Sequence, residues 1–247
     1  MSQVNPYSNA SVASPWTPAA LADESARASF IRRTYAHLAG AVLAFLGIEV
    51  VLFGLVPEPF MRRVVASMTG GYMWLVVLGA FMGIGWLARS WASSGASRSM
   101  QYTGLALYVV AEAVIFLPIL YIAVIVMGQP QIPVLAGIIT FMTFAGLTAF
   151  VFTTKVDLAS WGKYLCIAGL VAMGMIVCGI LFGFSLGLFF SAAMVALAAG
   201  YILYDTSNVL HHYSTDQHVA ASLALFASVA FLFWYVLRLV MAFSSSD

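Results

Sequence analysis

The stretch that decides the fold is "LGLFFSAAMVALAAGYILYDTSNVLHHY", residues 186–213. From Leu186 to Tyr204 it contains no charged side chain, and a helix of about 20 such residues is long enough to cross the roughly 30 Å hydrocarbon core of a bilayer. The first charge of the stretch is Asp205. This carboxylate is either the first side chain exposed to water or a buried acid with a function. Which of the two applies depends on the solvent around the chain.

Composition identifies that solvent as lipid. The chain has 247 residues, of which 63% are hydrophobic and 8% charged, and its mean hydropathy is +0.99. A soluble domain would carry about 25% charged residues. We therefore predict an all-α polytopic membrane protein with seven transmembrane helices. The expected spans are 36–56, 72–88, 102–127, 132–152, 163–182, 186–204 and 219–243.

The rest of the sequence excludes several other classes. Residues 1–25 are rich in Ser, Pro, Ala and Asn and lack apolar periodicity, so we expect a disordered tail before a transmembrane domain at 26–247. The net charge of +1 argues against a nucleic-acid partner. Both cysteines fall in one apolar span, which favours neither a disulfide framework nor a zinc site. Without a recognisable catalytic motif, we expect neither an enzyme nor a cofactor.

Basic residues predict the orientation, because they are enriched in cytoplasmic segments. With the N-terminus in the cytoplasm, the outer connections hold only Arg62 and Arg63. The cytoplasmic segments then hold Arg27, Arg32, Arg33, Arg89, Arg98, Lys155 and Lys163. With seven spans, the C-terminus lies on the opposite side. Glycine pairs at four-residue spacing, Gly79 with Gly83 and Gly179 with Gly183, favour close packing between helices.

Ionisable residues inside a membrane span are costly and are candidate functional sites. From a helix rise of about 1.5 Å per residue, Glu112 lies about 15 Å deep, near the middle of the bilayer, and Glu49 lies towards the outer side. Asp205 lies about 9 Å inside the cytoplasmic end if its helix continues to His211. Three carboxylates at stepped depths suit a path for a cation.

The alternative is that each acid pairs with a basic or hydroxyl partner and locks helices together. Arg238 reaches about the same depth as Glu49, so these two residues could form such a structural pair. The segment "HHYSTDQH", 211–218, offers three histidines on the cytoplasmic side, but their spacing matches no usual zinc pattern and we expect solvated loop residues.

Three segments carry a resemblance to a known family. They are "RRTYAHLAGAVLAFLGIE" (32–49), "FAGLTAFVFTTKVDLASWGKYL" (144–165) and "YILYDTSNVL" (201–210). Their order and spacing resemble the Bax inhibitor-1 (transmembrane BAX-inhibitor-motif) family over nearly the whole chain from about residue 28. The resemblance implies a central helix ringed by six others and a pH-sensitive calcium leak. It also implies two aspartates that share a proton and an arginine on the second helix that locks the path.

Asp205 matches the first of these aspartates, and Arg89 stands at the end of the second helix. The last helix departs from the pattern: in "ALFASVAFLFWYVLRL" (224–239), Ser228 replaces the second aspartate and Phe231 replaces a usual asparagine. A close carboxylate pair titrates as a unit, and a lone Asp205 loses this coupling. One carboxylate also binds calcium more weakly than two. Glu112, at about the depth of Ser228, is a candidate for the missing charge.

The leading hypothesis is a cation leak with calcium as the transported or bound ion, Asp205 as its ligand, and Glu112, Ser228, Arg89 and Glu49 along the path. The competing hypothesis is a non-conducting regulator that binds a membrane protease or another membrane protein, because some bacterial members of the family are associated with protease modulation. A proton-coupled transporter is less favoured without internal repeats. The short tail and lack of retention signals favour a bacterial inner membrane.

Overall fold

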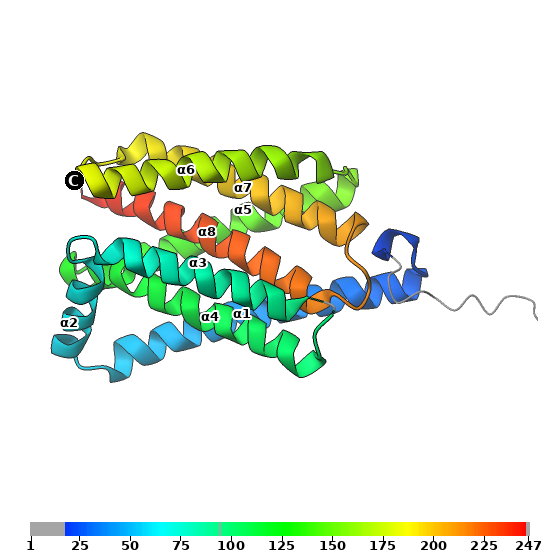
Figure 1. Ribbon diagram of the computed structural model, residues 1–247, viewed down its shortest axis with the longest axis horizontal. Helices are drawn as coiled ribbons and strands as arrows, with labels where there is room; N and C mark the ends of the chain where they lie inside the picture. The colour runs from blue at the N-terminus through cyan, green and yellow to red at the C-terminus, as the bar shows by residue number, and fades with distance from the viewer. Residues whose placement is uncertain (1–17, 94, 246–247) are drawn as a thin grey trace, which may run out of the picture.

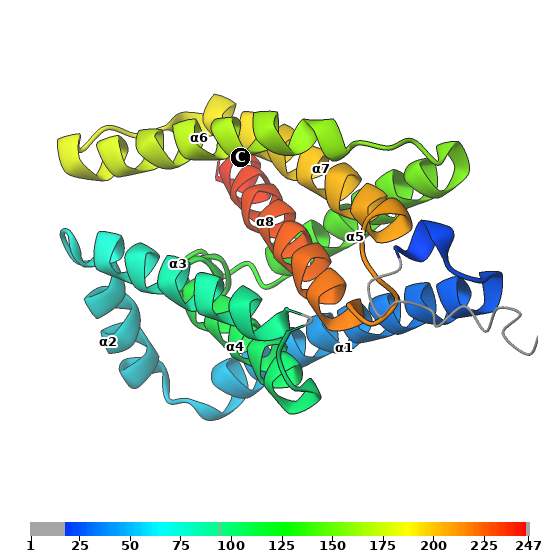
Figure 2. The same cartoon turned by 45° about the vertical axis from the view of Figure 1, so that its right-hand side comes forward.

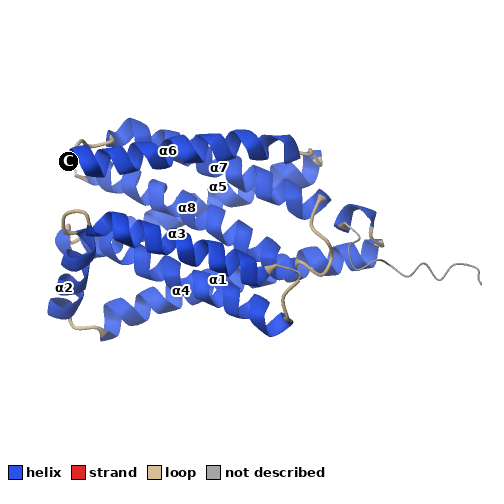
Figure 3. Ribbon diagram, in the orientation of Figure 1, coloured by secondary structure: helices blue, strands red, loops and turns tan. Residues whose placement is uncertain are grey.

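The computed structural model describes residues 18–93 and 95–245, and nearly all of this part of the chain is helical (Figure 1). Outside the helices, the described residues contain an isolated β-bridge between Pro18 and Ser214 (Figure 3). The elements are η1 (Ala19–Leu21), α1 (Glu24–Leu55), α2 (Glu58–Thr69), α3 (Met73–Ala92), α4 (Arg98–Tyr121), η2 (Ile122–Val126), α5 (Gln131–Thr154), η3 (Ala159–Trp161), α6 (Gly162–Phe182), α7 (Gly187–His211) and α8 (His218–Ser244).

Seven of the described helices are long and apolar enough to cross a membrane, which confirms the predicted fold class. They are α1, α3, α4 with η2, α5, η3 with α6, α7 and α8. The observed helices run a turn or more beyond several predicted spans, because polar residues at the ends extend the helix without adding to hydropathy. The clearest case is α1, which begins at Glu24 rather than near residue 36.

The structure describes only part of the tail that we predicted at residues 1–25. Residues 1–17 lie outside the described residues. Residues 18–25, in contrast, are ordered: Ala19 is fully buried and its N–H donates to the carbonyl of Tyr213 at 2.8 Å. The tail as predicted therefore extends too far, because composition alone gave no sign that Ala19 docks on the α7–α8 connection.

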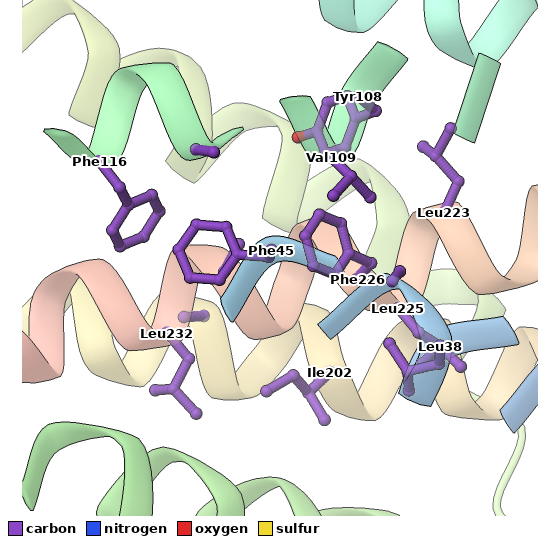
Figure 4. Packing of buried hydrophobic residues seen from close by; sticks show 14 of the residues in the cluster. Leu38, Phe45, Tyr108, Val109, Phe116, Ile202, Leu223, Leu225, Phe226 and Leu232 are labelled. Atoms are coloured by element: carbon purple, nitrogen blue, oxygen red, sulfur yellow. The ribbon is translucent and has the colours of Figure 1, made fainter. Parts of the chain in front are cut away.

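The central helix is α8, which contacts α1, α3, α4, α5 and α7 (Figure 2). It is consequently among the most buried spans, together with α4. Aromatic packing fills the space between these helices: the ring of Phe45 on α1 lies edge-on to Phe116 on α4 and to Phe226 on α8, at 5.2 and 6.4 Å (Figure 4). The remaining span, α6, lies at the outside of the bundle and packs mainly against α7.

Helices α3 and α4 approach each other closely because of one glycine. A Cβ on Gly104 would lie 2.6 Å from the carbonyl oxygen of Ala88, which no other residue type could tolerate without a shift. The predicted close-packing pair Gly79 and Gly83 does not have this role, since a Cβ on either would meet nothing within 4 Å. Gly104 thereby fixes where the last turn of α3, and with it Arg89, lies over α4.

Two features shape the other end of the bundle, where the C-terminus lies. Pro118 inside α4 lacks a backbone N–H, and four residues later the helix continues as a π-helical turn, η2. The additional helix α2 was not predicted as an element; its residues Met61, Val65 and Met68 are buried, and it lies across this end of the bundle rather than along it (Figure 1).

Candidate ion path

Asp205 is a buried acid and not the first charge in water. Its helix continues for six residues to His211, so the carboxylate lies about 9 Å inside the helix end. The side chain is buried between α7 and α8, where the Ser228 hydroxyl donates a hydrogen bond to Asp205 Oδ2. Because α8 follows α7 after a six-residue connection, the two antiparallel helices bring these residues face to face. The position that carries an aspartate in the resembling family is therefore in direct contact with Asp205.

The residues after Asp205 attach α7 to the α5–α6 connection. The buried Ser207 hydroxyl accepts a hydrogen bond from Leu158 N at 2.8 Å and donates to the carbonyl of Val156 at 3.1 Å. One turn later, His212 Nε2 lies 3.0 Å from Asp157 Oδ1. These contacts join the segments around 155–158 and 205–212, which are far apart in the sequence, into one junction.

Electrostatics at this junction are set by exposed groups outside the spans. The hydrogen bond with His212 holds the pKa of Asp157 below its usual value, with a second contribution from the backbone N–H of Ala159. Asp157 is mostly exposed, so solvent screens the pair and its contribution to stability is small. The prediction that the histidines of 211–218 are ordinary loop residues thus misses a contact, because Asp157 is 55 residues away in sequence.

Arg89 lies in the last turn of α3, near two acids of the predicted path, Asp205 and Glu112. Its guanidinium carbon is 5.8 Å from the centre of the Tyr108 ring, and its charge acts on both Asp205 and Glu112. No ion pair within 4.0 Å is formed by Arg89 among the described residues. Arg89 is therefore a cation placed near two carboxylates without being bound to either.

Glu112 is buried in the middle of α4, where its carboxylate accepts a hydrogen bond from Tyr108, one helical turn earlier. Its interactions are with Tyr108 and Arg89, whereas those of Asp205 are with Ser228 and Arg89. The two acids thus share Arg89, and the structure shows no direct interaction between them. Whether Glu112 substitutes for the missing aspartate stays a prediction.

Glu49 has a different environment from the other two acids. It is 7% exposed on α1, and neither carboxylate oxygen has a hydrogen-bond partner among the residues that the structure describes. The expected structural pair with Arg238 is not formed among the described residues: the Arg238 guanidinium instead lies 5.9 Å from the centre of the Tyr235 ring. Equal depth therefore does not bring the two side chains together: Arg238 lines a pocket with Trp74 and Trp234, and Glu49 is not part of that lining.

The structure also shows a polar cluster that sequence reasoning missed. His218, the first residue of α8, is buried, and its ring centre lies 5.1 Å from that of His37 on α1. The Tyr102 hydroxyl on α4 is 3.4 Å from His218 Nε2. The sequence offered His37 within a predicted span and His218 in the segment 211–218, where a solvated loop residue was expected; that expectation is wrong for His218, which is buried at the start of α8. Nothing in the sequence paired His37 with residues 65 and 181 positions later.

For a divalent cation the side chains offer few ligands in one place. No group of three or more His, Cys, Asp or Glu side chains converges within residues 18–93 and 95–245. The Asp205 pair supplies one carboxylate and one hydroxyl, which is fewer charged oxygens than a tight calcium site uses.

Seven membrane-spanning helices, with α8 at the centre and buried acids on three of the helices that contact it, define an integral multi-pass α-helical membrane protein. The sequence model of one family, described as "Inhibitor of apoptosis-promoting Bax1", matches residues 27–245. The chain belongs to this family, the Bax inhibitor-1 family.

Individual relatives agree with the family match. The chain is 30% identical to Bax inhibitor 1 of Schizosaccharomyces pombe over 117 residues and 33% identical to Protein lifeguard 4 of Mus musculus over 115 residues. These matches cover 45% and 43% of the chain, and 43% and 45% of the relatives, so each spans less than half the length of the curated relative. An uncharacterised protein of Campylobacter jejuni is 29% identical over 222 residues, which is 87% of this chain and 89% of that protein.

Proposed function

We propose that this protein is a pH-modulated cation leak, with calcium as the leading candidate ion, and that the contact between Asp205 and Ser228 is part of its gate. The observation that carries the proposal is the buried Asp205 carboxylate held by Ser228 across the α7–α8 interface, with the Arg89 charge beside it. Burying an ionisable side chain in a membrane span costs free energy, and the residues that do so usually have a function.

The positions of the other acids support a path that follows α8. Asp205, Glu112 and Glu49 lie on α7, α4 and α1, and each of these helices contacts α8. All three side chains are buried in this conformation, so the arrangement corresponds to a closed state of the proposed path. A cation moving along it would exchange part of its hydration shell for one carboxylate at a time.

In this proposal Arg89 is the residue that keeps the path closed. A fixed positive charge near Asp205 and Glu112 opposes entry of a cation at this end, and release of Arg89 towards water would remove that barrier. The side chain is exposed and has no ion-pair partner within 4.0 Å in the described part of the chain, so its movement would break no ion pair.

The experiment is calcium flux into liposomes that contain the purified full-length protein and an entrapped calcium indicator. We expect flux above that of empty vesicles and a change in both rate and pH dependence in Asp205→Asn. Arg89→Gln should raise the flux. Glu24→Gln, an exposed acid at the same end of the bundle, is the matched control and should leave the flux unchanged.

A second candidate function is a non-conducting regulator that binds another membrane protein, such as a membrane protease. The observation that favours it is Ser228 itself, because this chain has a hydroxyl where a conducting pair would need a second carboxylate. Flux equal to that of empty vesicles at every pH, from protein that is folded and inserted, would select this candidate over the leak.

We further propose that the protein lies in a bacterial inner membrane with its N-terminus in the cytoplasm. The basic residues support this orientation: those predicted to be cytoplasmic all lie at the end of the bundle where α1 and α8 begin. The Asp205 contact and Arg89 then face the cytoplasm, and α2 lies on the outer side (Figure 1).

A further inference from the structure

A pocket of about 310 Å³ opens at the end of the bundle where α2 and the C-terminus lie. It is far from the Asp205 contact and is formed by α3, α4, η2 and α8. Its lining is mostly apolar, with one charged side chain: it includes Trp74, Ile119, Ile122, Trp234, Arg238 and Met241.

The two tryptophans form one wall of this pocket. The rings of Trp74 on α3 and Trp234 on α8 are stacked, with centres 6.3 Å apart and an angle of 18° between their planes. Phe116 on α4 holds Trp234 from another side, edge-on at 5.1 Å. Tryptophan is enriched at the level of lipid headgroups, where its apolar ring and polar N–H meet different solvents. The pocket therefore has the composition of a membrane–water interface.

Arg238 gives the pocket a positive charge that no acid in the described chain neutralises. It forms no ion pair within 4.0 Å in residues 18–93 and 95–245, and its guanidinium lies over the Tyr235 ring at 5.9 Å. The residue is six positions before the end of α8, about 9 Å from the helix end. At this depth the long arginine side chain can keep its stem among apolar groups and place its head at the headgroup level.

The properties of helix α2 indicate that the end of the bundle with the pocket lies at the membrane–water interface. It is amphipathic, with Met61, Val65 and Met68 buried against the bundle and Arg62 and Arg63 exposed. Such a helix lies in the plane of the interface, and α2 lies across the bundle end as this requires (Figure 2). Thr69, at the last residue of α2, is part of the pocket lining. If α2 lies in the interface, the pocket beside it is at the depth where lipid phosphates are found.

We propose that this pocket binds the headgroup of an anionic phospholipid. The phosphate would accept hydrogen bonds from the Arg238 guanidinium, which matches phosphate oxygens with two parallel donors. The glycerol region would lie against the stacked tryptophans. The acyl chains would follow the apolar surface formed by Ile119, Ile122 and Met241. None of the three acids of the proposed ion path is among the lining residues of this pocket, and the proposal does not depend on conduction.

Quenching of tryptophan fluorescence by brominated lipids tests the proposal directly, because bromine quenches only tryptophans that it contacts. The purified full-length protein is placed in phosphatidylcholine vesicles that contain increasing fractions of one brominated lipid, either phosphatidylglycerol or phosphatidylcholine. We expect the brominated phosphatidylglycerol to quench at about fivefold lower content than brominated phosphatidylcholine, the preference expected of one arginine near a phosphate. Trp234→Phe should remove most of the difference in quenching between the two brominated lipids, which would identify Trp234 as the quenched residue.

Substitutions of Arg238 complete the experiment. Arg238→Gln should reduce the preference to about one, and Arg238→Lys, which keeps the charge but not the two-donor geometry, should leave an intermediate value. Lys163→Gln is the matched control, because Lys163 also lies over an aromatic ring, at 5.0 Å from Tyr164, but at the opposite end of the bundle. It should leave the preference unchanged.

Three results would overturn the proposal. The first is equal quenching of the unaltered protein by the two lipids, which requires no variant to fold. The second is a preference that survives in Arg238→Gln. The third is loss of the preference on addition of inorganic phosphate at millimolar concentration at constant ionic strength, which would identify a site for free phosphate and not for a lipid.

Discussion

At the scale of the residue, the contact between Asp205 and Ser228 is the feature on which the proposed function depends. A serine can donate one hydrogen bond to the carboxylate, but it adds no charge and cannot share a proton with it as a second carboxylic acid would. The sequence alone allowed the comparison with a missing aspartate. It did not establish that position 228 lies in hydrogen-bond contact with Asp205, because that contact depends on how α7 and α8 pack.

Restoring the missing acid is the sharpest residue-scale prediction. Ser228→Asp would place two carboxylates in contact, and two such groups titrate as a pair because both cannot easily ionise together. We expect the flux to change over a narrower pH interval and calcium to bind more tightly, since two carboxylates can chelate where one cannot. Calcium flux at stepped pH and calcium-dependent thermal stability measure the two effects. Ser228→Asn, similar in size but uncharged, is the control and should produce neither.

The junction between Asp157 and His212 gives a prediction about pH and stability. The hydrogen bond with His212 lowers the pKa of Asp157 in the folded protein, so the stabilisation is present above the ordinary value of 3.8 and is lost as pH falls through the lower folded value. Asp157→Asn should therefore lower the free energy of unfolding by less than about 1 kcal/mol at pH 5. The difference should vanish near pH 2. A larger difference in acid than at pH 5 would contradict this account.

At the scale of the element, the crossing of α3 and α4 determines where Arg89 lies. The sequence contained Gly104, but many glycines share its context, and only the structure shows that a Cβ there would lie 2.6 Å from the Ala88 carbonyl. The other elements were predictable to different degrees. Apolar runs gave all seven spans, because length and hydropathy are local properties. Helix α2 was missed, because a 12-residue amphipathic helix at the bundle end has no comparable run.

Substitution of this glycine tests the role of the crossing. Gly104→Ala should destabilise the protein by about 1–3 kcal/mol, because overpacking at a tight contact forces the backbones apart. It should also disturb the position of Arg89 and so alter the flux. Gly79→Ala is the matched control in α3: its Cβ would meet nothing within 4 Å, and alanine favours the helix by about 0.5–1 kcal/mol. Thermal unfolding in detergent compares the two, and equal effects would exclude the crossing as the cause.

At the scale of the whole molecule, the arrangement around α8 unites features that the sequence presents far apart. Asp205, Glu112 and Glu49 lie on helices that are long and apolar enough to cross a membrane, and all three side chains are buried. That they form a path for a cation stays a prediction. The predicted pairing of Glu49 with Arg238 was wrong, because depth along a helix says nothing about the direction in which a side chain leaves it. The His37–His218 contact was missed for the same reason.

Topology is the whole-molecule prediction. Seven spans would place the two termini on opposite sides of the membrane, and the distribution of basic residues predicts that the beginning of α1 lies in the cytoplasm. Reporter fusions that are active only in the cytoplasm should report the N-terminus there and the C-terminus outside. Two termini on the same side would refute a seven-span arrangement, and the reverse orientation would place Arg89 and Asp205 on the outer side.

The measurement that tests the central claim most directly is calcium flux into proteoliposomes by the unaltered protein and by Asp205→Asn, at pH values from 5 to 8. The account predicts flux above empty vesicles, with a gradual dependence on pH that Asp205→Asn changes in both rate and shape while Glu24→Gln does not. Flux that is the same in the unaltered protein and in Asp205→Asn at every pH would contradict the assignment of Asp205 to the gate.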